Sequence, residues 1–506
     1  MSKLSEDKAG IAPGSTSKLD RRELLRSGAA LVGGTAAASL LPSLARAVAV
    51  TQRTTAVEWV ATTQNSQWQS RSDAVINASA ESPDMEVLLD QPQQTIQGFG
   101  GCFNELGWDA LSSLEPADRQ GVLRELFAPG VGANFGLCRM PLGANDFSRD
   151  WYSYDETAGD FDLKHFSIAN DQHTLVPFIE GARHYNQDLR LWASPWSPPA
   201  WMKRNQHYAA AISYPGTPPN GLKPEQVGKE GTDMFIQEDK YFHTYAAYFA
   251  RFIEAYKQLG IRIGMVMPQN EFNSAQAFPS CTWTPEGLAK FIRVLGPQMQ
   301  KHDVEVFFGT MERADEKLFD TVMADPVASK YIKGVGLQWA GKGAIAGIHR
   351  RYPGLMLYQS EQECGDGKND WKYCVYTWSL MRHYMENGAN AYMYWNIALK
   401  RGGVSRWGWA QNSLVTVDSD FKTFRYNYEY YLLKHLSHFV APGARRLPLA
   451  DKDSNALAFI NPDQSVAILI RNDEVSNKGI RLKFGGKMLT AWLEADSFNT
   501  FLLKGN

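Results

Sequence analysis

The stretch of sequence that decides the fold is GMVMPQNEFN, residues 264–273. Its first half is short and apolar, which is typical of a buried β-strand. Its second half places two amides and a carboxylate, Gln269, Asn270 and Glu271, directly after that strand. In parallel α/β proteins the binding and catalytic groups lie at the carboxyl ends of the strands. The stretch therefore predicts a parallel sheet whose strand ends carry chemistry.

Seven further apolar runs occur along the chain, and amphipathic segments with apolar residues three and four apart separate them. This alternation predicts parallel strands with helical crossovers, and eight strands predict a (β/α)8 TIM barrel over residues 95–440. An open doubly wound sheet has the same alternation. No G-x-G-x-x-G or Walker pattern follows the first run, which argues against nucleotide binding. The eight runs are TIQGFGG (95–101), FGLCRMP (135–141), LRLWASP (189–195), IGMVMPQNE (263–271), VEVFFGT (304–310), GVGLQWA (334–340), LMLYQSE (355–361) and AYMYWNIAL (391–399).

The segments on either side of the barrel have a different period. Residues 85–96, MEVLLDQPQQTI, and the tail from about residue 445 have patterns typical of antiparallel strands separated by polar turns. We expect these two ends to meet in one side β-sandwich domain. The expected division is a signal peptide (1–49), a lead-in with the first sandwich strands (50–94), the catalytic barrel (95–440) and the C-terminal part of the sandwich (441–506).

The first 49 residues have the layout of an export signal. The pair Arg21-Arg22 precedes a mildly apolar run rich in alanine and glycine, which ends in small-residue sites at Ala47 and Ala49. The arginine pair is similar to a twin-arginine signal. We expect cleavage near Ala47 or Ala49 and a periplasmic or secreted protein. A membrane anchor is the alternative, but the apolar run is short for a span and no later segment reaches about eighteen apolar residues. We therefore expect no stable membrane insertion after cleavage.

Charge and metal-ligand spacing exclude several classes of function. The net charge of −2 gives no electrostatic basis for binding nucleic acid. The five cysteines include no C-x-x-C pair, and their odd number leaves at least one outside any intramolecular disulfide. His435 and His438 have a spacing that metal ligands can use, but they lie in an aromatic helical segment where packed histidines are expected. We predict no metal and no other cofactor.

Carboxylates end two of the predicted strands. Glu361 and Glu363 end or follow the seventh run, as Glu271 ends the fourth. The fourth and seventh strands lie on opposite arcs of a closed barrel, so their carboxyl ends face one central pocket. Two carboxylates about 5 Å apart are the catalytic pair of a retaining glycosidase. Strand alternation points Glu361 and Glu363 the same way and does not choose between them. Other strand ends carry an amide and three indoles: Asn270, Trp196, Trp339 and Trp395.

Over nearly all of its mature length the chain resembles glycoside hydrolase family 30, the group that includes lysosomal glucosylceramidase. The resemblance implies a barrel with a side β-sandwich, which agrees with the pattern of runs. It also implies a cofactor-free enzyme that acts on a carbohydrate or glycoconjugate. The blocks that carry it are GFGGCFNELGWDAL (98–111), RMPLGANDFSRDWYSYDE (139–156), LWASPWSPPAWMK (191–203), QNEFN (269–273), YQSEQECG (358–365) and YWNIAL (394–399).

The resemblance also assigns roles to residues. It implies that Glu271 is the general acid/base and that Glu361, rather than Glu363, is the nucleophile. It implies that Asn270 holds the sugar 2-hydroxyl and that Arg139 lies beneath the site as a charge partner of the carboxylates. The other positions expected to bind the substrate are Asp146, Trp196, Trp339, Trp395 and Asn396.

One departure from the family bears on the substrate. Gln338, Trp339 and Ala340 stand where glucosylceramidase has His-Trp-Tyr, which argues against a ceramide-linked substrate. We expect a retaining β-glycosidase, with a β-glucosidic bond as the first expectation. The family also includes β-xylosidases, β-fucosidases, β-1,6-glucanases and β-1,6-galactanases, which are the alternatives. A sugar-binding protein without catalysis is the alternative of another class, and the presence of both Glu271 and Glu361 argues against it.

Overall fold

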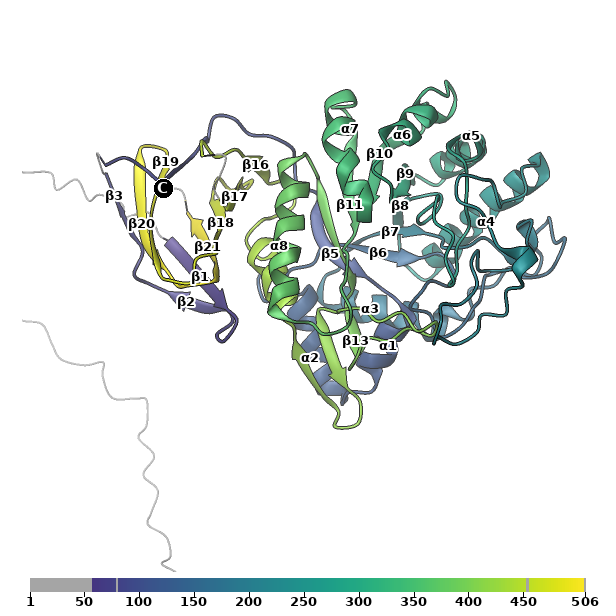
Figure 1. The fold of residues 1–506 in the computed structure, drawn as a ribbon, viewed down its shortest axis with the longest axis horizontal. Coiled ribbons are helices and arrows are strands. Elements are labelled where there is room, and N and C mark those ends of the chain that lie inside the picture. The colour runs from purple at the N-terminus through teal and green to yellow at the C-terminus, as the bar shows by residue number, and fades with distance from the viewer. Residues whose placement is uncertain (1–56, 79–80, 452–454, 505–506) are drawn as a thin grey trace, which may run out of the picture. The chain divides into compact units, whose positions relative to one another are not determined.

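The structure is a computed structural model, and it describes residues 57–78, 81–451 and 455–504. The expected export signal, residues 1–49, lies outside the described residues. The described part of the chain contains a closed barrel, a six-stranded sheet, a four-stranded sheet and a small three-stranded sheet (Figure 1).

Eight parallel strands, β5 to β12, follow one another in chain order around the barrel, and β12 pairs with β5 to close it. Each of the eight predicted runs overlaps one of these strands, so the predicted (β/α)8 barrel is confirmed. The strands are short and nearly wholly buried because helices cover their outer side and side chains fill the interior. Their bounds are β5 Gly98–Cys102, β6 Leu137–Pro141, β7 Arg190–Ser194, β8 Ile263–Val266, β9 Glu305–Met311, β10 Ile332–Gln338, β11 Met356–Glu361 and β12 Ala391–Asn396.

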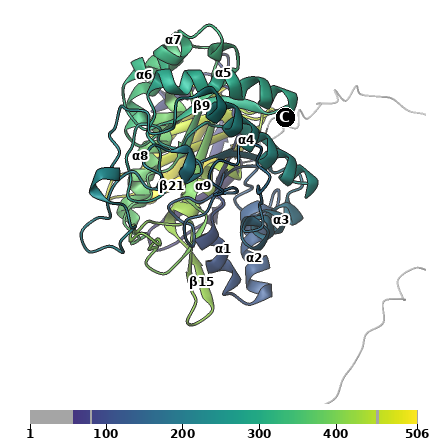
Figure 2. The same ribbon diagram turned by 90° about the vertical axis from the view of Figure 1, so that its right-hand side faces the viewer.

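Helices surround the barrel, as the view in Figure 2 shows for α3 to α8. The sequence signals of a helix start hold at α5, where Pro285 is the first helical residue and the Thr284 side chain accepts a hydrogen bond from Gly287 N–H at 2.9 Å. The helices are α1 Glu105–Ser112, α2 Pro116–Phe127, α3 Leu175–Tyr185, α4 Asp239–Gln258, α5 Pro285–Lys301, α6 Glu316–Met323, α7 Ile345–Arg351, α8 Trp371–Glu386 and α9 Tyr428–Ser437. Short 3-10 segments lie at Asp171–His173, Ala200–Met202, Pro224–Gln226, Ala328–Lys330 and Trp339–Ala344.

The side domain takes strands from both ends of the chain. One sheet has the order β16-β17-β18-β21-β1-β2 and the other β3-β20-β19-β4. Apolar residues of both sheets, such as Trp59, Ile468, Leu482 and Phe501, form a core separate from that of the barrel. The strands are β1 Val57–Thr63, β2 Gln69–Arg71, β3 Val75–Asn77, β4 Met85–Val87, β16 Arg445–Leu447, β17 Ala456–Ile460, β18 Val466–Asn472, β19 Lys478–Phe484, β20 Lys487–Leu493 and β21 Ser497–Leu503. The small sheet contains β13 Ala398–Lys400, β14 Val415–Asp418 and β15 Thr423–Tyr426.

The expectation of an antiparallel strand over residues 85–96 is confirmed only at two isolated antiparallel bridges, Val87 with Leu449 and Thr95 with Arg445. Only Met85–Val87 forms a strand, and it pairs with β19 in parallel. The segment that follows contains Pro92, which has no N–H to donate to a sheet. Its backbone bonds instead to the β16 segment at separate points, for example from Gln93 N–H to the Arg446 carbonyl at 2.7 Å.

A buried histidine joins the last barrel helix to the side sheets. His435 in α9 contacts the hydroxyl of Thr500 in β21 through Nδ1 at 2.9 Å, and that of Thr62 in β1 through Nε2 at 2.8 Å. Thr500 Oγ1 also donates to the His435 carbonyl at 2.9 Å, so its own acceptor site is left for Nδ1–H. The ring is therefore held neutral, and burial lowers the pKa of His435 to about 3.

This histidine predicts a pH-dependent stability. In the unfolded chain His435 takes up a proton below about pH 6.5, whereas in the folded chain it stays neutral down to about pH 3. Its contribution to the free energy of unfolding is therefore complete above about pH 6.5 and is lost as the pH falls below that value. A His435→Gln variant loses both threonine contacts but does not titrate. We expect the difference in free energy of unfolding between wild type and variant, measured by urea unfolding, to decrease by about 2 kcal/mol when the pH is lowered from about 7.5 to 5. A constant difference would contradict this account.

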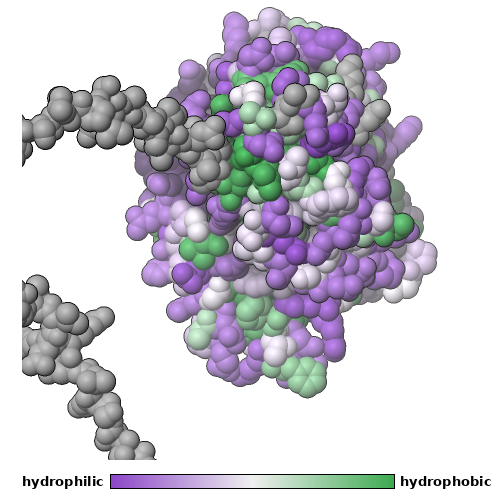
Figure 3. Space-filling view, turned by 90° about the vertical axis from the view of Figure 1, so that its left-hand side faces the viewer, coloured by the Kyte–Doolittle hydropathy of each residue, from purple (hydrophilic) through white to green (hydrophobic). Residues whose placement is uncertain are grey.

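The surface and the cysteines of the described part of the chain have the following features. On the face in Figure 3 hydrophilic residues predominate and hydrophobic residues form separate groups. Within the described ranges no helix is both long enough and apolar enough to cross a membrane. The five cysteines are buried and free. Among all residues that the structure describes, there is no group of three or more His, Cys, Asp or Glu side chains that could hold a metal ion.

Candidate active site

A pocket of about 310 Å³ lies where the barrel strands end at their carboxyl side. Six of the nine residues predicted for the site line it: Asp146, Trp196, Asn270, Glu271, Trp339 and Glu361. The other lining residues come from the loops after the strands: Ser274, Gln276, Phe278, Glu312, Arg313, Ala340, Trp409 and Gln411.

Glu271 follows the fourth barrel strand, β8, in a tight turn. Its backbone φ is 45°, in the left-handed region that residues other than glycine rarely adopt. Two hydrogen bonds hold this conformation: Glu271 N–H donates to Thr310 Oγ1 at 2.9 Å, and Ser274 N–H donates to the Glu271 carbonyl at 2.9 Å. Glu271 is 9% exposed, and it lines the pocket. A strained backbone held by neighbouring strands is typical of a functional position.

Glu361 is the last residue of the seventh barrel strand, β11. Its Oε2 accepts a hydrogen bond from Arg139 Nη1 at 2.7 Å, and the two side chains form a buried ion pair. Its Oε1 accepts one from Trp339 Nε1 at 3.3 Å. Both oxygens are therefore fixed in direction, which suits a carboxylate that must attack along a defined line.

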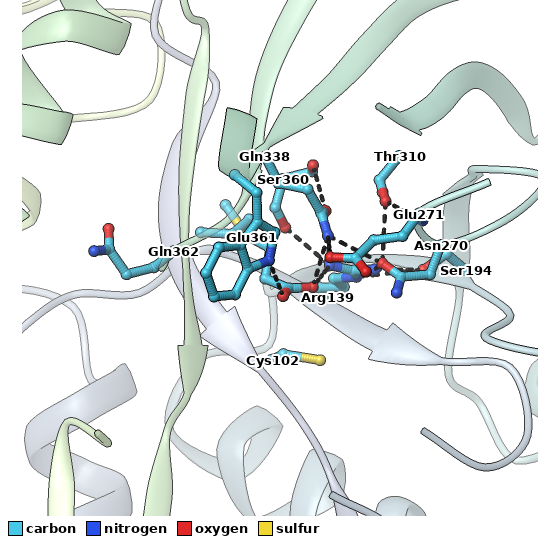
Figure 4. Close-up of polar contacts among 12 residues, drawn as sticks. Cys102, Arg139, Ser194, Asn270, Glu271, Thr310, Gln338, Ser360, Glu361 and Gln362 are labelled. Carbon is cyan, nitrogen blue, oxygen red and sulfur yellow. Dashed lines mark hydrogen bonds and ion pairs between the residues drawn. The ribbon is translucent and has the colours of Figure 1, made fainter. Parts of the chain in front are cut away.

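The amide of Gln338 bridges the two carboxylates (Figure 4). Its Nε2 lies 3.2 Å from Glu271 Oε1 and 3.2 Å from Glu361 Oε2. The two oxygens can therefore be at most twice that distance apart, and this close approach favours the narrower carboxyl spacing of retaining enzymes over that of inverting ones. Ser360 Oγ donates to Gln338 Oε1 at 2.9 Å, which orients the amide with Nε2 toward the acids.

The surroundings separate the charge states of the two acids. Burial raises the pKa of Glu271 well above its usual value, and the negative charge of Glu361 raises it further. Burial also raises the pKa of Glu361, but the guanidinium of Arg139 and the hydrogen bond from Trp339 oppose this rise. Arg139 forms its ion pair with Glu361 and not with Glu271. The arrangement favours a proton on Glu271 and a negative charge on Glu361, the division of labour between a general acid and a nucleophile.

Glu363, the alternative that strand alternation left open, has other partners. Its Oε1 accepts from Lys342 Nζ at 2.7 Å and its Oε2 from Tyr376 Oη at 2.8 Å. It is not among the residues that line the pocket. Strand alternation would point Glu361 and Glu363 to the same side only if both lay in the strand. The strand β11 ends at Glu361, so this rule does not apply to Glu363.

Arg139 lies beneath the pocket among aromatic rings. It is fully buried, and its guanidinium carbon lies 4.4 Å from the ring centroid of Trp196, 4.9 Å from that of Trp192 and 5.4 Å from that of Trp395. Its Nη2 donates to Ser194 Oγ at 2.9 Å and to Asn270 Oδ1 at 2.7 Å. A cation held by π-faces and hydrogen bonds in this way is fixed in place even when no substrate is bound.

Two of the residues predicted for the site have a buried polar atom without a hydrogen-bond partner within the described residues. These are Asp146 Oδ1 and Trp395 Nε1. Asp146 lines the pocket, and burial raises the pKa of its carboxyl well above the usual value. The Trp395 side chain is close enough to Asp146 to oppose this rise in pKa, although neither atom completes a regular hydrogen bond. Buried polar atoms are normally satisfied, so this pair suits a polar ligand such as a sugar hydroxyl.

The structure does not bring Asn396 to the pocket. Asn396 is fully buried. Its Oδ1 accepts from Asn104 Nδ2 at 3.0 Å, and its Nδ2 donates to Gln411 Oε1 at 3.0 Å. Both ends of the amide are thus bonded to protein, and Gln411 lies between Asn396 and the pocket surface as a lining residue. Both Trp395 and Asn396 were expected to bind the substrate, but neighbouring positions of a strand point to opposite sides.

Sequence reasoning missed two polar residues of the site. Gln338 was noted as a departure from the family, but its contact with both acids was not foreseen. Glu312 follows the fifth predicted strand by two residues and lines the pocket, yet no role was assigned to it. The signal that found Glu271, an acid directly after a buried strand, was also present at Glu312.

Comparison with known proteins gives the class and then the family. A family model described as the glycosyl hydrolase family 30 TIM-barrel domain matches residues 96–440. Lysosomal acid glucosylceramidase of Mus musculus is 28% identical over 422 residues, which are 76% of this chain and 77% of that protein. Endo-1,6-beta-D-glucanase neg1 of Aspergillus fumigatus is 25% identical over 413 residues, which are 75% of this chain and 79% of that protein.

Solved structures agree in fold. SrfJ from Salmonella typhimurium superposes with a TM-score of 0.77 at 23% identity, covering 89% of this chain and 100% of that one. A structure of an endo-beta1,6-glucanase gives a TM-score of 0.75 at 23% identity, also covering 89% of this chain and 100% of the other.

The protein is thus a glycoside hydrolase, an enzyme that acts on carbohydrate substrates. Because the family model covers more than half of the chain, the chain belongs to glycoside hydrolase family 30.

Proposed function

We propose that this glycoside hydrolase is a retaining enzyme that cleaves β-glucosidic bonds, with Glu361 as nucleophile and Glu271 as general acid/base. The observation that carries the proposal is the single amide nitrogen of Gln338, 3.2 Å from an oxygen of each acid. These contacts bring one oxygen of each acid close together, which supports the narrow carboxylate spacing of retaining enzymes over the wider spacing of inverting ones.

In the first step, Glu361 Oε attacks the anomeric carbon and forms a bond to it. Glu271 gives its proton to the glycosidic oxygen as the bond from that oxygen to the anomeric carbon breaks. In the second step, Glu271, now a carboxylate, takes a proton from a water molecule that attacks the same carbon. Glu361 is then released as a carboxylate, and the ion pair with Arg139 stabilises its charge.

Asn270 is placed to bind the sugar 2-hydroxyl. Its Oδ1 accepts hydrogen bonds from Arg139 Nη2 at 2.7 Å and Thr310 Oγ1 at 3.0 Å, and Gln338 Nε2 lies 3.2 Å from it. The donors around the oxygen fix the orientation of the amide, so its Nδ2 remains for the ligand. A contact with the 2-hydroxyl strengthens as positive charge develops on the ring, and it therefore accelerates both steps.

The choice of glucose rests on the relatives. The names of the mouse glucosylceramidase and of the fungal endo-1,6-glucanase both specify a glucose unit. The unpartnered atoms of Asp146 and Trp395 are available to its outer hydroxyls. Ala340 lines the pocket where glucosylceramidase has a tyrosine, so the leaving-group side differs from that of a ceramide-cleaving enzyme.

A panel of 4-nitrophenyl β-glycosides tests the sugar. We expect the β-glucoside to have a kcat/KM at least about 10-fold above those of the β-xyloside, β-fucoside and β-galactoside, because a sugar that lacks or inverts a bound hydroxyl leaves a buried polar group unpaired. A preference for another sugar would overturn the glucosidic proposal but not the mechanism. Release from none of them, together with cleavage of a β-1,6-glucan, would identify an endo-acting enzyme.

A further inference from the structure

A third buried carboxyl lies in the pocket wall. Glu312 comes directly after the fifth barrel strand, β9, and is 1% exposed. It lines the same pocket as Glu271 and Glu361, but the proposed mechanism gives it no role. A buried acid beside a general acid needs an explanation, since isolated buried carboxylates are costly.

Glu312 holds the turn that carries Glu271. Its Oε1 accepts hydrogen bonds from Asn273 N–H at 3.1 Å and from Ser274 Oγ–H at 3.0 Å. Residues 271–274 form the turn in which Glu271 adopts its left-handed backbone conformation. One oxygen of Glu312 therefore holds the end of the turn at residues 273 and 274. Thr310, in the strand β9 that precedes Glu312, binds the start of the turn at Glu271 N–H.

The other oxygen of Glu312 is free of partners. Oε2 is buried, and it has no hydrogen-bond partner in the described residues. Burial raises the pKa of the Glu312 carboxyl to about 7, although the charge of Arg313 acts in the opposite direction. The charge of Glu312 is in turn the third cause, after burial and Glu361, of the raised pKa of Glu271. The carboxyl of Glu312 thus gains or loses its charge close to neutral pH.

The charged and titratable groups around this pair come from several elements. Arg313 Nη1 lies 3.6 Å from Glu312 Oε1, and Arg313 Nη2 donates to Glu230 Oε1 at 2.8 Å, so this cation is shared between two carboxylates. The groups that act on Glu271 are Glu312, Glu361, Asp146, Arg313 and Tyr214.

We propose that Glu312 is a positioning residue for the acid/base group: it clamps the turn of Glu271, and its negative charge keeps the proton on the Glu271 carboxyl. The proposal rests on the proposed function, in which Glu271 is the general acid. At neutral pH and above, where Glu312 becomes ionised, repulsion between the two carboxylates disfavours loss of the proton from Glu271. Glu271 therefore remains protonated to a higher pH than burial and the charge of Glu361 alone would allow.

The Glu312→Gln variant tests the charge. The glutamine oxygen still accepts from Asn273 N–H and Ser274 Oγ–H, so the clamp is kept while the charge is removed. We expect the alkaline limb of kcat/KM for phenyl β-glucoside to move to lower pH by about 0.5 to 1 unit. Phenyl β-glucoside is chosen because its leaving group departs poorly without a proton.

The Ser274→Ala variant is the matched control. It weakens the same clamp but keeps the carboxyl of Glu312, so we expect lower turnover with a smaller displacement of the alkaline limb than in Glu312→Gln. An unmoved limb in Glu312→Gln would overturn the proposal. An equal displacement in Ser274→Ala would also overturn it, because geometry rather than charge would then be responsible.

Infrared spectroscopy gives a readout that does not depend on turnover. The carbonyl band of protonated Glu271 is the band that a Glu271→Gln substitution removes. We expect this band to disappear at lower pH in Glu312→Gln than in wild type, and an unchanged titration would contradict the proposal. If neither phenyl β-glucoside nor a β-1,6-glucan is cleaved, the glucosidic proposal fails, and the infrared titration still decides the role of Glu312.

Discussion

Replacing Glu361 with glutamine is expected to reduce kcat by at least about 10⁴-fold, because an amide does not form the covalent glycosyl intermediate. The fold should persist. The glutamine oxygen still accepts from Arg139, and the guanidinium keeps its contacts with Ser194, Asn270 and the surrounding indole rings. Steady-state kinetics with 4-nitrophenyl β-glucoside, together with circular dichroism, separate loss of chemistry from loss of structure.

Glu363→Gln is the control for this experiment. Glu363 is bonded to Lys342 and Tyr376 outside the pocket, so we expect its variant to keep most of the wild-type activity. An inactive Glu363→Gln beside an active Glu361→Gln would reverse the assignment of the nucleophile. Azide should restore product formation to a Glu361→Gly variant by entering the vacated space, and the product should be the α-glycosyl azide.

The second large effect is expected at Glu271 and depends on the leaving group. In a Glu271→Ala variant, kcat/KM for 4-nitrophenyl β-glucoside should fall by less than about 10²-fold, since nitrophenolate departs with little protonation. For an alkyl β-glucoside or a disaccharide the loss should reach about 10³- to 10⁴-fold. The ratio kcat/KM is the proper measure, because it reports the first step and excludes the second step, in which Glu271 acts as base.

The test of this prediction is how strongly the loss in kcat/KM depends on the leaving group. A uniform loss for nitrophenyl, phenyl and alkyl substrates would remove the acid role from Glu271 and leave it a binding role. The raised pKa that burial and Glu361 give to Glu271 supports the acid role, because an acid must hold its proton at the pH of the reaction.

The barrel was predictable because its signal is local. Each strand is a short buried run followed by a helix of period 3.6, and one such run with its polar end, residues 264–273, already indicates the architecture. The side domain was harder to predict. Its strand β4 is only three residues long, and its parallel pairing with β19 joins segments about 400 residues apart, which no local pattern encodes.

The site shows the same division. The acids Glu271 and Glu361 could be found from the sequence because the carboxyl ends of barrel strands face one pocket, and the family resemblance chose Glu361 over Glu363. The direction of Asn396 could not, since it depends on competition among Asn104, Gln411 and Asn412 for its amide. The bridging contacts of Gln338 likewise depend on Ser360 fixing which end of the amide faces the acids.

The central claim is that this family 30 enzyme forms a covalent intermediate on Glu361. The most direct test is to trap that intermediate with 2-deoxy-2-fluoro-β-glucosyl fluoride, in which the fluorine at C2 slows both steps and the fluoride leaving group lets the first proceed. Peptide mass mapping of the inactivated protein then locates the sugar. The account predicts a single label on Glu361, absent from the Glu361→Gln variant. A label on Glu363 or Glu271, or continued turnover with no labelled carboxylate, would contradict it.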